Sequence, residues 1–122
     1  MKRLYVLTRS DLGLPYQAVQ GAHAVAQFML DNPDSEWKNG YLIFLSVDNE
    51  SELDHWEWKI QTKRDTKVSR FREPDINNEL TAIAVYSDGR LFRKLPIMGS
   101  DYEQPNERLQ NNRAGKYYGG AE

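Results

Sequence analysis

The sequence contains no cysteine. This absence excludes a disulfide framework, a cysteine-ligated zinc or iron–sulfur site and a cysteine nucleophile. The two histidines, His23 and His55, are too few for a metal site built from several imidazoles. We therefore expect neither a metal nor a cofactor. The net charge of -2 also gives no overall attraction to nucleic acid or to anionic lipid.

Long apolar runs are missing as well. Residues 4–7 are apolar, but polar residues follow at once, so this run is too short for the apolar part of a signal peptide. No run approaches the roughly 18 apolar residues that span a bilayer. We predict a cytoplasmic protein without membrane contact, with one domain over residues 1–98 and a polar tail over residues 99–122.

The apolar pattern predicts strands that alternate with helices. The predicted strands cover residues 4–7, 41–47, 68–72 and 81–86, and the predicted helices cover residues 16–30 and 50–63. This order implies two right-handed crossovers and three parallel strands. The last connection is too short for another helical crossover, so the fourth strand is expected to run antiparallel to the third. The sequence thus predicts a three-layer α/β fold, in which helices flank a mixed four-stranded sheet.

The first predicted helix has two distinct faces. One face is an apolar stripe that consists of Val19, Ala22, Ala26 and Met29. The other face is polar and consists of Tyr16, Gln20, His23 and Gln27. Spacings of three and four residues align side chains along a helix, and an apolar stripe at this spacing is typical of a face that packs on a core.

Polar residues are predicted to gather where the parallel strands end, because open α/β sheets bind ligands beyond the carboxyl ends of their strands. We call this predicted edge the rim. Its members come from the ends of the strands and from the start of the first helix: Asp11, Tyr16, Gln20, His23, Glu73, Asp75 and Thr81. Carboxylates, an imidazole, an amide and a hydroxyl in one place suffice for hydrolytic chemistry.

Two stretches of the chain match a known pattern. Residues 5–12, followed by Gln20-Gly21-Ala22-His23-Ala24, resemble the opening of the type II peptidyl-tRNA hydrolase family, which has an apolar strand, Arg-x-Asp-Leu and Gly-Lys-x-x-Ala-Gln-x-x-His-Ala. Asp75 and the strand that begins at Thr81 resemble that family's Asp loop and last strand. The resemblance covers roughly residues 3–98. The family's lysine and the glycine before it are replaced here by Tyr16 and Pro15, and the loop after Asp75 is shorter.

The resemblance implies an enzyme that hydrolyses the ester between a peptide and the terminal ribose of tRNA. Asp75 or His23 would orient the attacking water, and Gln20 and Thr81 would donate hydrogen bonds to the substrate or its oxyanion. Substrate contacts are expected from Tyr16, Asp11 and Glu73. The alternative is a non-catalytic module of the same fold that binds RNA, a nucleotide or a protein. A large separation of Asp75 from Gln20 and His23 would favour this alternative.

Binding of tRNA would require a local basic surface. Six bases lie within fourteen residues, at Lys59, Lys63, Arg64, Lys67, Arg70 and Arg72. Contacts between such side chains and phosphates give salt-dependent affinity without sequence preference. We expect the tRNA contacts to come from four of these bases: Lys63, Arg64, Arg70 and Arg72.

Structural explanations exist for several of these residues. A basic stretch is also typical of a solvated helix face. His23 has an alternative interpretation as a hydrogen-bonded core residue, Asp75 as a turn residue and Thr81 as a strand former. Contact between subunits is one use left open for the aromatic residues and the tail, so a homodimer is among the partners considered.

Overall fold

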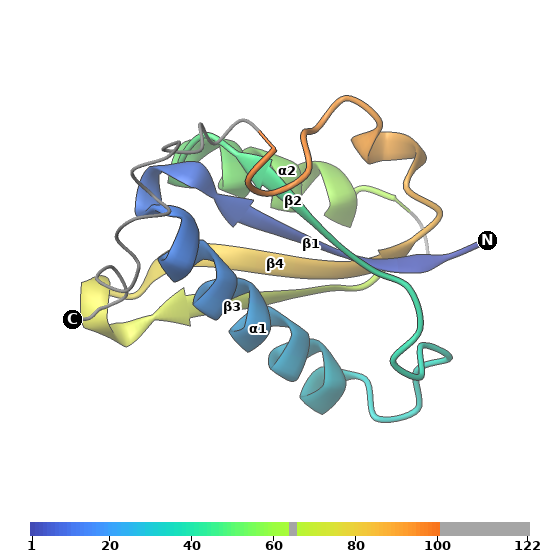
Figure 1. The fold of residues 1–122 in the computed structure, drawn as a ribbon. Coiled ribbons are helices and arrows are strands. Elements are labelled where there is room, and N and C mark those ends of the chain that lie inside the picture. Colours follow the sequence, from blue (N-terminus) through green and yellow to red (C-terminus); the bar gives the residue numbers. More distant parts are fainter. Residues whose placement is uncertain (64–65, 101–122) are drawn as a thin grey trace, which may run out of the picture.

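The computed structural model describes residues 1–63 and 66–100, which form a four-stranded sheet with helices packed on it (Figure 1). The strands are β1 (Arg3–Arg9), β2 (Leu42–Val47), β3 (Val68–Glu73) and β4 (Glu79–Ser87). The helices are α1 (Leu14–Asp31) and α2 (Glu50–Gln61), with short 3-10 turns η1 (Ser10–Leu12), η2 (Pro74–Ile76) and η3 (Arg90–Phe92). All six predicted elements are confirmed, with shifts of a few residues at their ends.

The strand directions make the sheet mixed. Its order is β2-β1-β4-β3, in which β1 and β2 are parallel and β4 is antiparallel to both of its neighbours. Strands β1, β2 and β3 therefore share one direction, as predicted. Because β4 runs in the opposite direction, its first residues lie beside the last residues of β1 and β3, at the end of the sheet where the rim was predicted.

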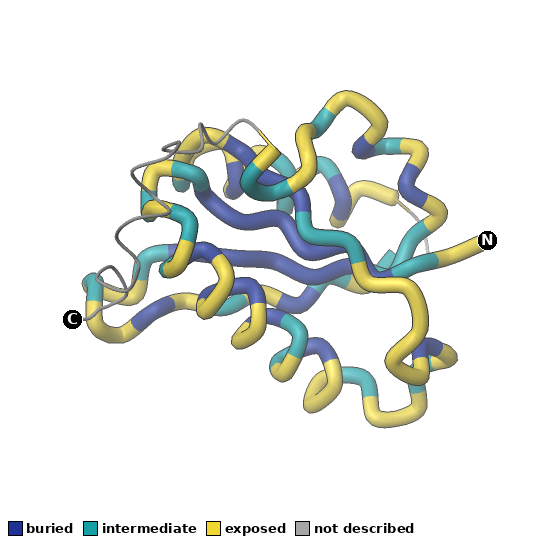
Figure 2. Tube along the Cα trace, viewed as in Figure 1, coloured by how far each residue is buried: buried dark blue, intermediate teal, exposed yellow. Residues whose placement is uncertain are grey.

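The two faces of the sheet carry separate hydrophobic cores. Alternate residues of a strand point to opposite faces. Leu4 and Val6 of β1 therefore pack in a cluster with Phe28 of α1, whereas Tyr5 and Leu7 join the cluster that contains Leu53 and Ile60 of α2. Figure 2 shows the strands as the most deeply buried part of the chain. The result is an α/β arrangement with one main helix on each face of the sheet.

The start of α2 is capped by Asn49 and Glu52. The Asn49 side chain accepts a hydrogen bond from the Glu52 N–H at 3.0 Å. The Glu52 carboxylate in turn accepts from the Asp48 N–H at 3.2 Å. These contacts satisfy backbone donors that the first turn of a helix leaves without partners.

The buried face of α1 differs from the one that its apolar stripe predicts. Val19 and Met29 are 51% and 44% exposed. The buried residues of α1 are Gln17, Gln20, Gly21, Ala24 and Phe28. Two reasons explain this orientation. Gly21 has no room for a Cβ beside the Phe44 ring, so a small residue must face the sheet there. The two glutamines find hydrogen-bond partners in the sheet, which removes the cost of burying them.

The apolar run of residues 41–47 is typical of a strand buried on both faces, but only the second half of β2 is buried. It lies at one edge of the sheet, and Leu42 is 43% exposed. Residues 96–98 cover part of this edge, through hydrogen bonds of 2.9 Å from the Ser46 N–H to the Pro96 carbonyl and from the Met98 N–H to the Phe44 carbonyl. An apolar run does not reveal whether a strand is central or at an edge, which explains the difference.

No helix within residues 1–63 and 66–100 has the length and apolar character that crossing a membrane requires. The predicted polar tail lies outside the described residues, apart from Gly99 and Ser100.

Candidate functional site

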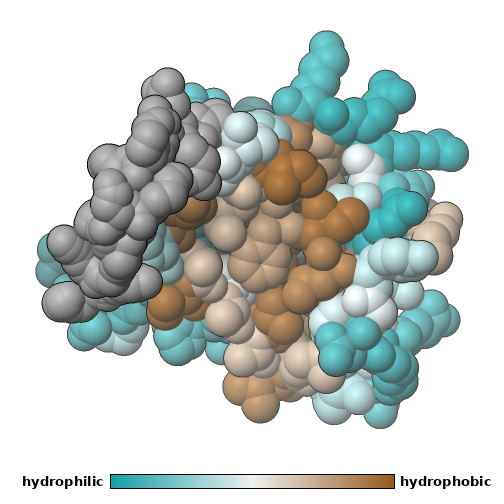
Figure 3. Space-filling view, in the orientation of Figure 1, coloured by the Kyte–Doolittle hydropathy of each residue, from teal (hydrophilic) through white to brown (hydrophobic). Residues whose placement is uncertain are grey.

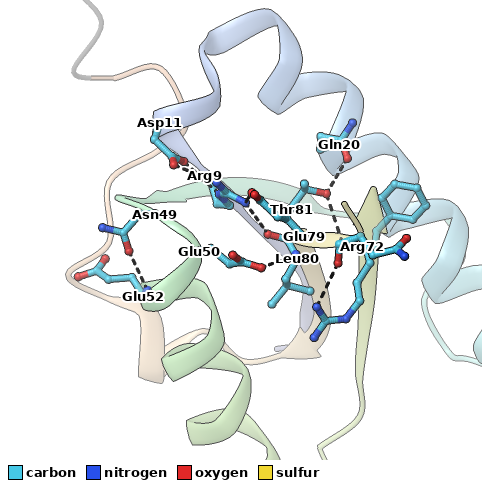
Figure 4. A network of polar contacts seen from close by, with 12 residues as sticks. Arg9, Asp11, Gln20, Asn49, Glu50, Glu52, Arg72, Glu79, Leu80 and Thr81 are labelled. Carbon is cyan, nitrogen blue, oxygen red and sulfur yellow. Dashed lines mark hydrogen bonds and ion pairs between the residues drawn. The ribbon is translucent and has the colours of Figure 1, made fainter. Parts of the chain in front are cut away.

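Three buried side chains, Gln20, Glu73 and Thr81, form a row of hydrogen bonds that connects α1 to β3 and β4 at the rim. The Gln20 amide nitrogen donates a hydrogen bond of 2.8 Å to the Glu73 carboxylate. The Thr81 hydroxyl donates one of 2.6 Å to the Gln20 amide oxygen, and Figure 4 shows this oxygen pointing at Thr81. Because an ionised carboxylate can only accept, this orientation of the amide satisfies both partners.

A register shift between β3 and β4 aims Thr81 at Gln20. Phe71 lies opposite Ala82, but the next residue, Arg72, lies opposite Leu80. Thr81 is therefore the extra residue of a bulge. A bulge of this kind re-aims a side chain: the Thr81 hydroxyl reaches α1 on the same side of the sheet as Ala82.

The Glu73 carboxylate is held in its ionised form. The hydrogen bond from Gln20 is the largest cause, followed by the one from the Asp75 N–H at 3.2 Å. Together with the charge of His23, these contacts outweigh burial and lower the pKa of Glu73 below its ordinary value. A carboxylate with a lowered pKa is a weak proton acceptor. Glu73 is therefore suited to orient a neighbouring hydrogen-bond donor and to stabilise a positive charge.

Tyr16 occupies the first turn of α1 on the same side of the helix as Gln20 and His23. Partial burial raises the pKa of its phenol, and the negative charges of Glu73 and Asp75 raise it further. The phenol therefore keeps its proton at neutral pH and remains a hydrogen-bond donor. This residue stands where the family pattern of the sequence resemblance has a lysine.

His23 lies on the surface of the rim. It is exposed, and its ring stacks on Phe71 with the centroids 4.4 Å apart and the planes 10° apart. Its charge acts on Glu73. The alternative interpretation of His23 as a buried core histidine is therefore wrong, and the stacking holds an accessible imidazole beside a carboxylate.

Asp75 is exposed in η2 immediately after β3. Its backbone N–H and the Gln20 amide bind the same Glu73 carboxylate. The backbone of Asp75 and the side chain of Gln20 thus meet at the Glu73 carboxylate, and His23 lies close enough for its charge to act on this carboxylate.

Asp11 belongs to a second cluster at the same edge, around a buried arginine. The Arg9 guanidinium forms two hydrogen bonds with Asp11, at 2.9 and 3.0 Å, and one of 2.9 Å with Glu79. It also donates to the Leu80 carbonyl at 3.0 Å (Figure 4). The bond to Asp11 is the main cause that raises the pKa of Arg9. Both carboxylates are therefore already engaged by Arg9.

The predicted basic surface is divided in the structure. Lys63 lies at the opposite end of the sheet, where it lines a pocket of about 360 Å³ with Lys2 and Arg90. Arg70 forms an ion pair with Glu57 of α2. Arg72 donates to the Asn78 carbonyl at 3.3 Å beside the rim. The fourth predicted contact, Arg64, lies outside the described residues.

Sequence reasoning missed the role of Gln17. Its amide oxygen accepts hydrogen bonds from the buried hydroxyls of Thr8 at 2.8 Å and Ser46 at 3.2 Å, so it ties α1 to β1 and β2. The signal was present: Gln17 and Gln20 are three residues apart, which places them on one helix face. Two glutamines on one face indicate that this face meets polar groups.

Comparison with known proteins adds no family. No protein-family model matches the chain, and no curated protein matches it. Within the described part of the chain, no group of three histidine or acidic side chains is arranged to hold a metal ion.

Proposed function

We propose that the chain has the fold and the activity of a type II peptidyl-tRNA hydrolase, and that it hydrolyses the ester between a peptide and the 3′ ribose of tRNA. The hydrogen bond of 2.8 Å between Gln20 and Glu73 carries the proposal. It joins the helix motif of the resemblance to the end of β3. Around this one carboxylate lie a protonated phenol from Tyr16, an accessible imidazole from His23 and the backbone N–H of Asp75, whose own carboxylate acts on Tyr16.

Ester hydrolysis needs an activated water and a donor for the developing oxyanion. In our proposal, His23 takes a proton from the water as its oxygen attacks the ester carbonyl carbon. Glu73 stabilises the imidazolium that forms, and Asp75 orients the water. The Tyr16 phenol donates a hydrogen bond to the oxyanion. When the tetrahedral intermediate collapses, the C–O bond to the ribose breaks, and the imidazolium returns the proton to the ribose oxygen.

Gln20 and Thr81 have a positioning role in this scheme. Both side chains are fully buried, and each uses its hydrogen-bonding groups on protein partners. They therefore act through Glu73, whose carboxylate they hold in place, rather than as donors to the substrate.

The test is the release of an N-acetylated amino acid from tRNA by the purified full chain. We expect turnover by the wild type and a loss of about 10²–10⁴-fold in His23→Ala, the range for a general base. Asp75→Asn should also lose activity. His55→Ala is the matched control, because His55 is the second histidine and stacks near Trp58 on α2, away from the rim. It should retain the wild-type rate.

The second candidate is a binding module of the same fold. The observation that favours it is the tyrosine at position 16, since a phenol stabilises negative charge less than the lysine of the family pattern. A wild-type protein that binds tRNA without turnover would establish this candidate. Full activity in His23→Ala would instead contradict the role of that imidazole.

A further inference from the structure

The outer face of α1 is apolar and exposed along the whole helix. We call it the outer face and define it by six exposed residues: Ala18, Val19, Ala22, Ala26, Met29 and Leu30. Leu30 is 75% exposed. From Leu14 to Leu30 the helix contains no aspartate, glutamate, lysine or arginine. A surface helix normally turns its polar side to water, whereas this one turns Gln17 and Gln20 to the sheet.

The outer face continues onto the neighbouring edge of the sheet. The Phe44 ring of β2 lies against Gly21 of α1. Beyond it, Tyr41, Leu42 and Ile97 are 61%, 43% and 56% exposed. Figure 3 shows the same feature as a broad hydrophobic area across the middle of this side of the molecule. One cation lies against this surface, because the Arg3 guanidinium sits over the Tyr41 ring at 5.6 Å from its centroid. A contiguous apolar surface with few charged residues is typical of the core of a protein interface.

We propose that this surface binds the same surface of a second copy of the chain. A twofold interface brings one patch against itself, so the patch must be complementary to itself. The outer face of α1 meets this condition because it contains no charged residue, so no like charges are brought together there. Ala22 and Ala26 lie four residues apart near the middle of α1 and are small, which lets two α1 helices approach closely. The larger Val19 and Met29 flank them.

The required area indicates that the edge of the sheet takes part. A helix of 18 residues is about 27 Å long and about 10 Å wide, so its flat footprint is roughly 270 Å². Stable interfaces bury about 800 Å² of accessible surface on each partner. The α1 helix alone is too narrow for this, whereas α1 together with Tyr41, Leu42 and Ile97 forms a wider platform.

The rim lies beside the outer face, on another flank of α1. Tyr16 and His23 lie on the flank of α1 that faces β3, where His23 stacks on Phe71. The outer face and the candidate site thus occupy different sides of the same helix. The proposal does not depend on the proposed function, since it follows from the exposed apolar surface alone.

The test is the molar mass of the full chain in solution, measured by sedimentation equilibrium over a wide range of concentration. We expect a mass of twice 14.2 kDa for the wild type. Ala22→Glu and Ala26→Glu should each weaken dimerisation by about 100-fold or more, because they force like charges together across the interface. Both positions are exposed and glutamate is a good helix former, so the variants should fold, which circular dichroism checks.

Trp58→Glu is the matched control. Trp58 is 62% exposed on α2, which covers the opposite face of the sheet. This variant also replaces an exposed apolar residue with glutamate, and it should remain a dimer. A wild type that is monomeric at every concentration overturns the proposal. So does a dimer that persists in both alanine variants, or one that Trp58→Glu dissociates.

Discussion

The Gln20 amide and the Glu73 carboxylate form a hydrogen bond of 2.8 Å across 53 positions of the sequence. Gln20 is fully buried in α1, and Glu73 is the last residue of β3. The bond holds Gln20 of α1 against the end of β3. It also keeps the carboxylate ionised at the point where Tyr16, His23 and Asp75 come together.

The lowered pKa of Glu73 predicts a specific effect of acid on stability. Below the ordinary value of 4.5, the unfolded chain binds a proton at this position while the folded chain still does not. The free energy of unfolding should therefore fall as the pH drops through this window. The stabilisation is fully present above pH 4.5 and is lost as the pH passes below the folded pKa.

Glu73→Gln should remove this part of the pH dependence. Urea unfolding of the variant, measured between neutral pH and pH 3, should give a shallower acid slope than the wild type. Glu36→Gln is the control, since Glu36 is an exposed loop residue, and it should keep the wild-type slope. Equal slopes for Glu73→Gln and the wild type would show that the carboxylate is not held as described.

Thr81→Val should destabilise the fold by about 1–3 kcal/mol, the cost of a buried acceptor left without its donor. The Gln20 amide oxygen would lose the 2.6 Å hydrogen bond from Thr81, and valine has nearly the same shape as threonine. Thr81→Ser keeps the hydroxyl and should be less destabilising. Urea titration of the three proteins measures the difference, and an equal loss in both variants would attribute it to packing.

Arg9→Gln should destabilise the protein more than the same change at an exposed pair. Arg9 is 7% exposed and binds Asp11, Glu79 and a carbonyl. Since both carboxylates are partly exposed, we expect a loss of about 1–3 kcal/mol rather than the full cost of breaking a buried pair. The control is Arg90→Gln, where the arginine is 89% exposed beside Asp88. Its effect should stay within about 0.5 kcal/mol, and thermal or urea unfolding compares the two.

Arg72→Gln should weaken tRNA binding and reduce its dependence on salt. A phosphate contact that is lost lowers the slope of log affinity against log salt by about one. Arg72 is exposed and lies beside the rim, where it reaches the Asn78 carbonyl. Lys63→Gln, at the other end of the sheet, tests the second part of the predicted basic surface. An unchanged slope in both variants would remove these residues from the tRNA contact.

The sequence by itself determined the elements and their directions. Apolar runs with β-branched residues marked the strands, and the short connection between Arg72 and Thr81 required an antiparallel β4. It also brought Tyr16, Gln20, Glu73 and Thr81 to one rim, because parallel strands end at a common edge. Such local signals depend on a few neighbouring residues, so they can be recognised in the sequence without knowledge of the tertiary structure.

Only the tertiary structure decided which side of each element is buried and which polar groups meet. The apolar stripe of α1 predicted that Val19 and Met29 would face the core. Gln17 and Gln20 face the sheet instead, because hydroxyls and a carboxylate from three strands form hydrogen bonds with them there. The bulge that turns Thr81 toward Gln20 depends on the register between β3 and β4. The free energy of burying an amide depends on partners that are far away in the sequence, so no local pattern contains it.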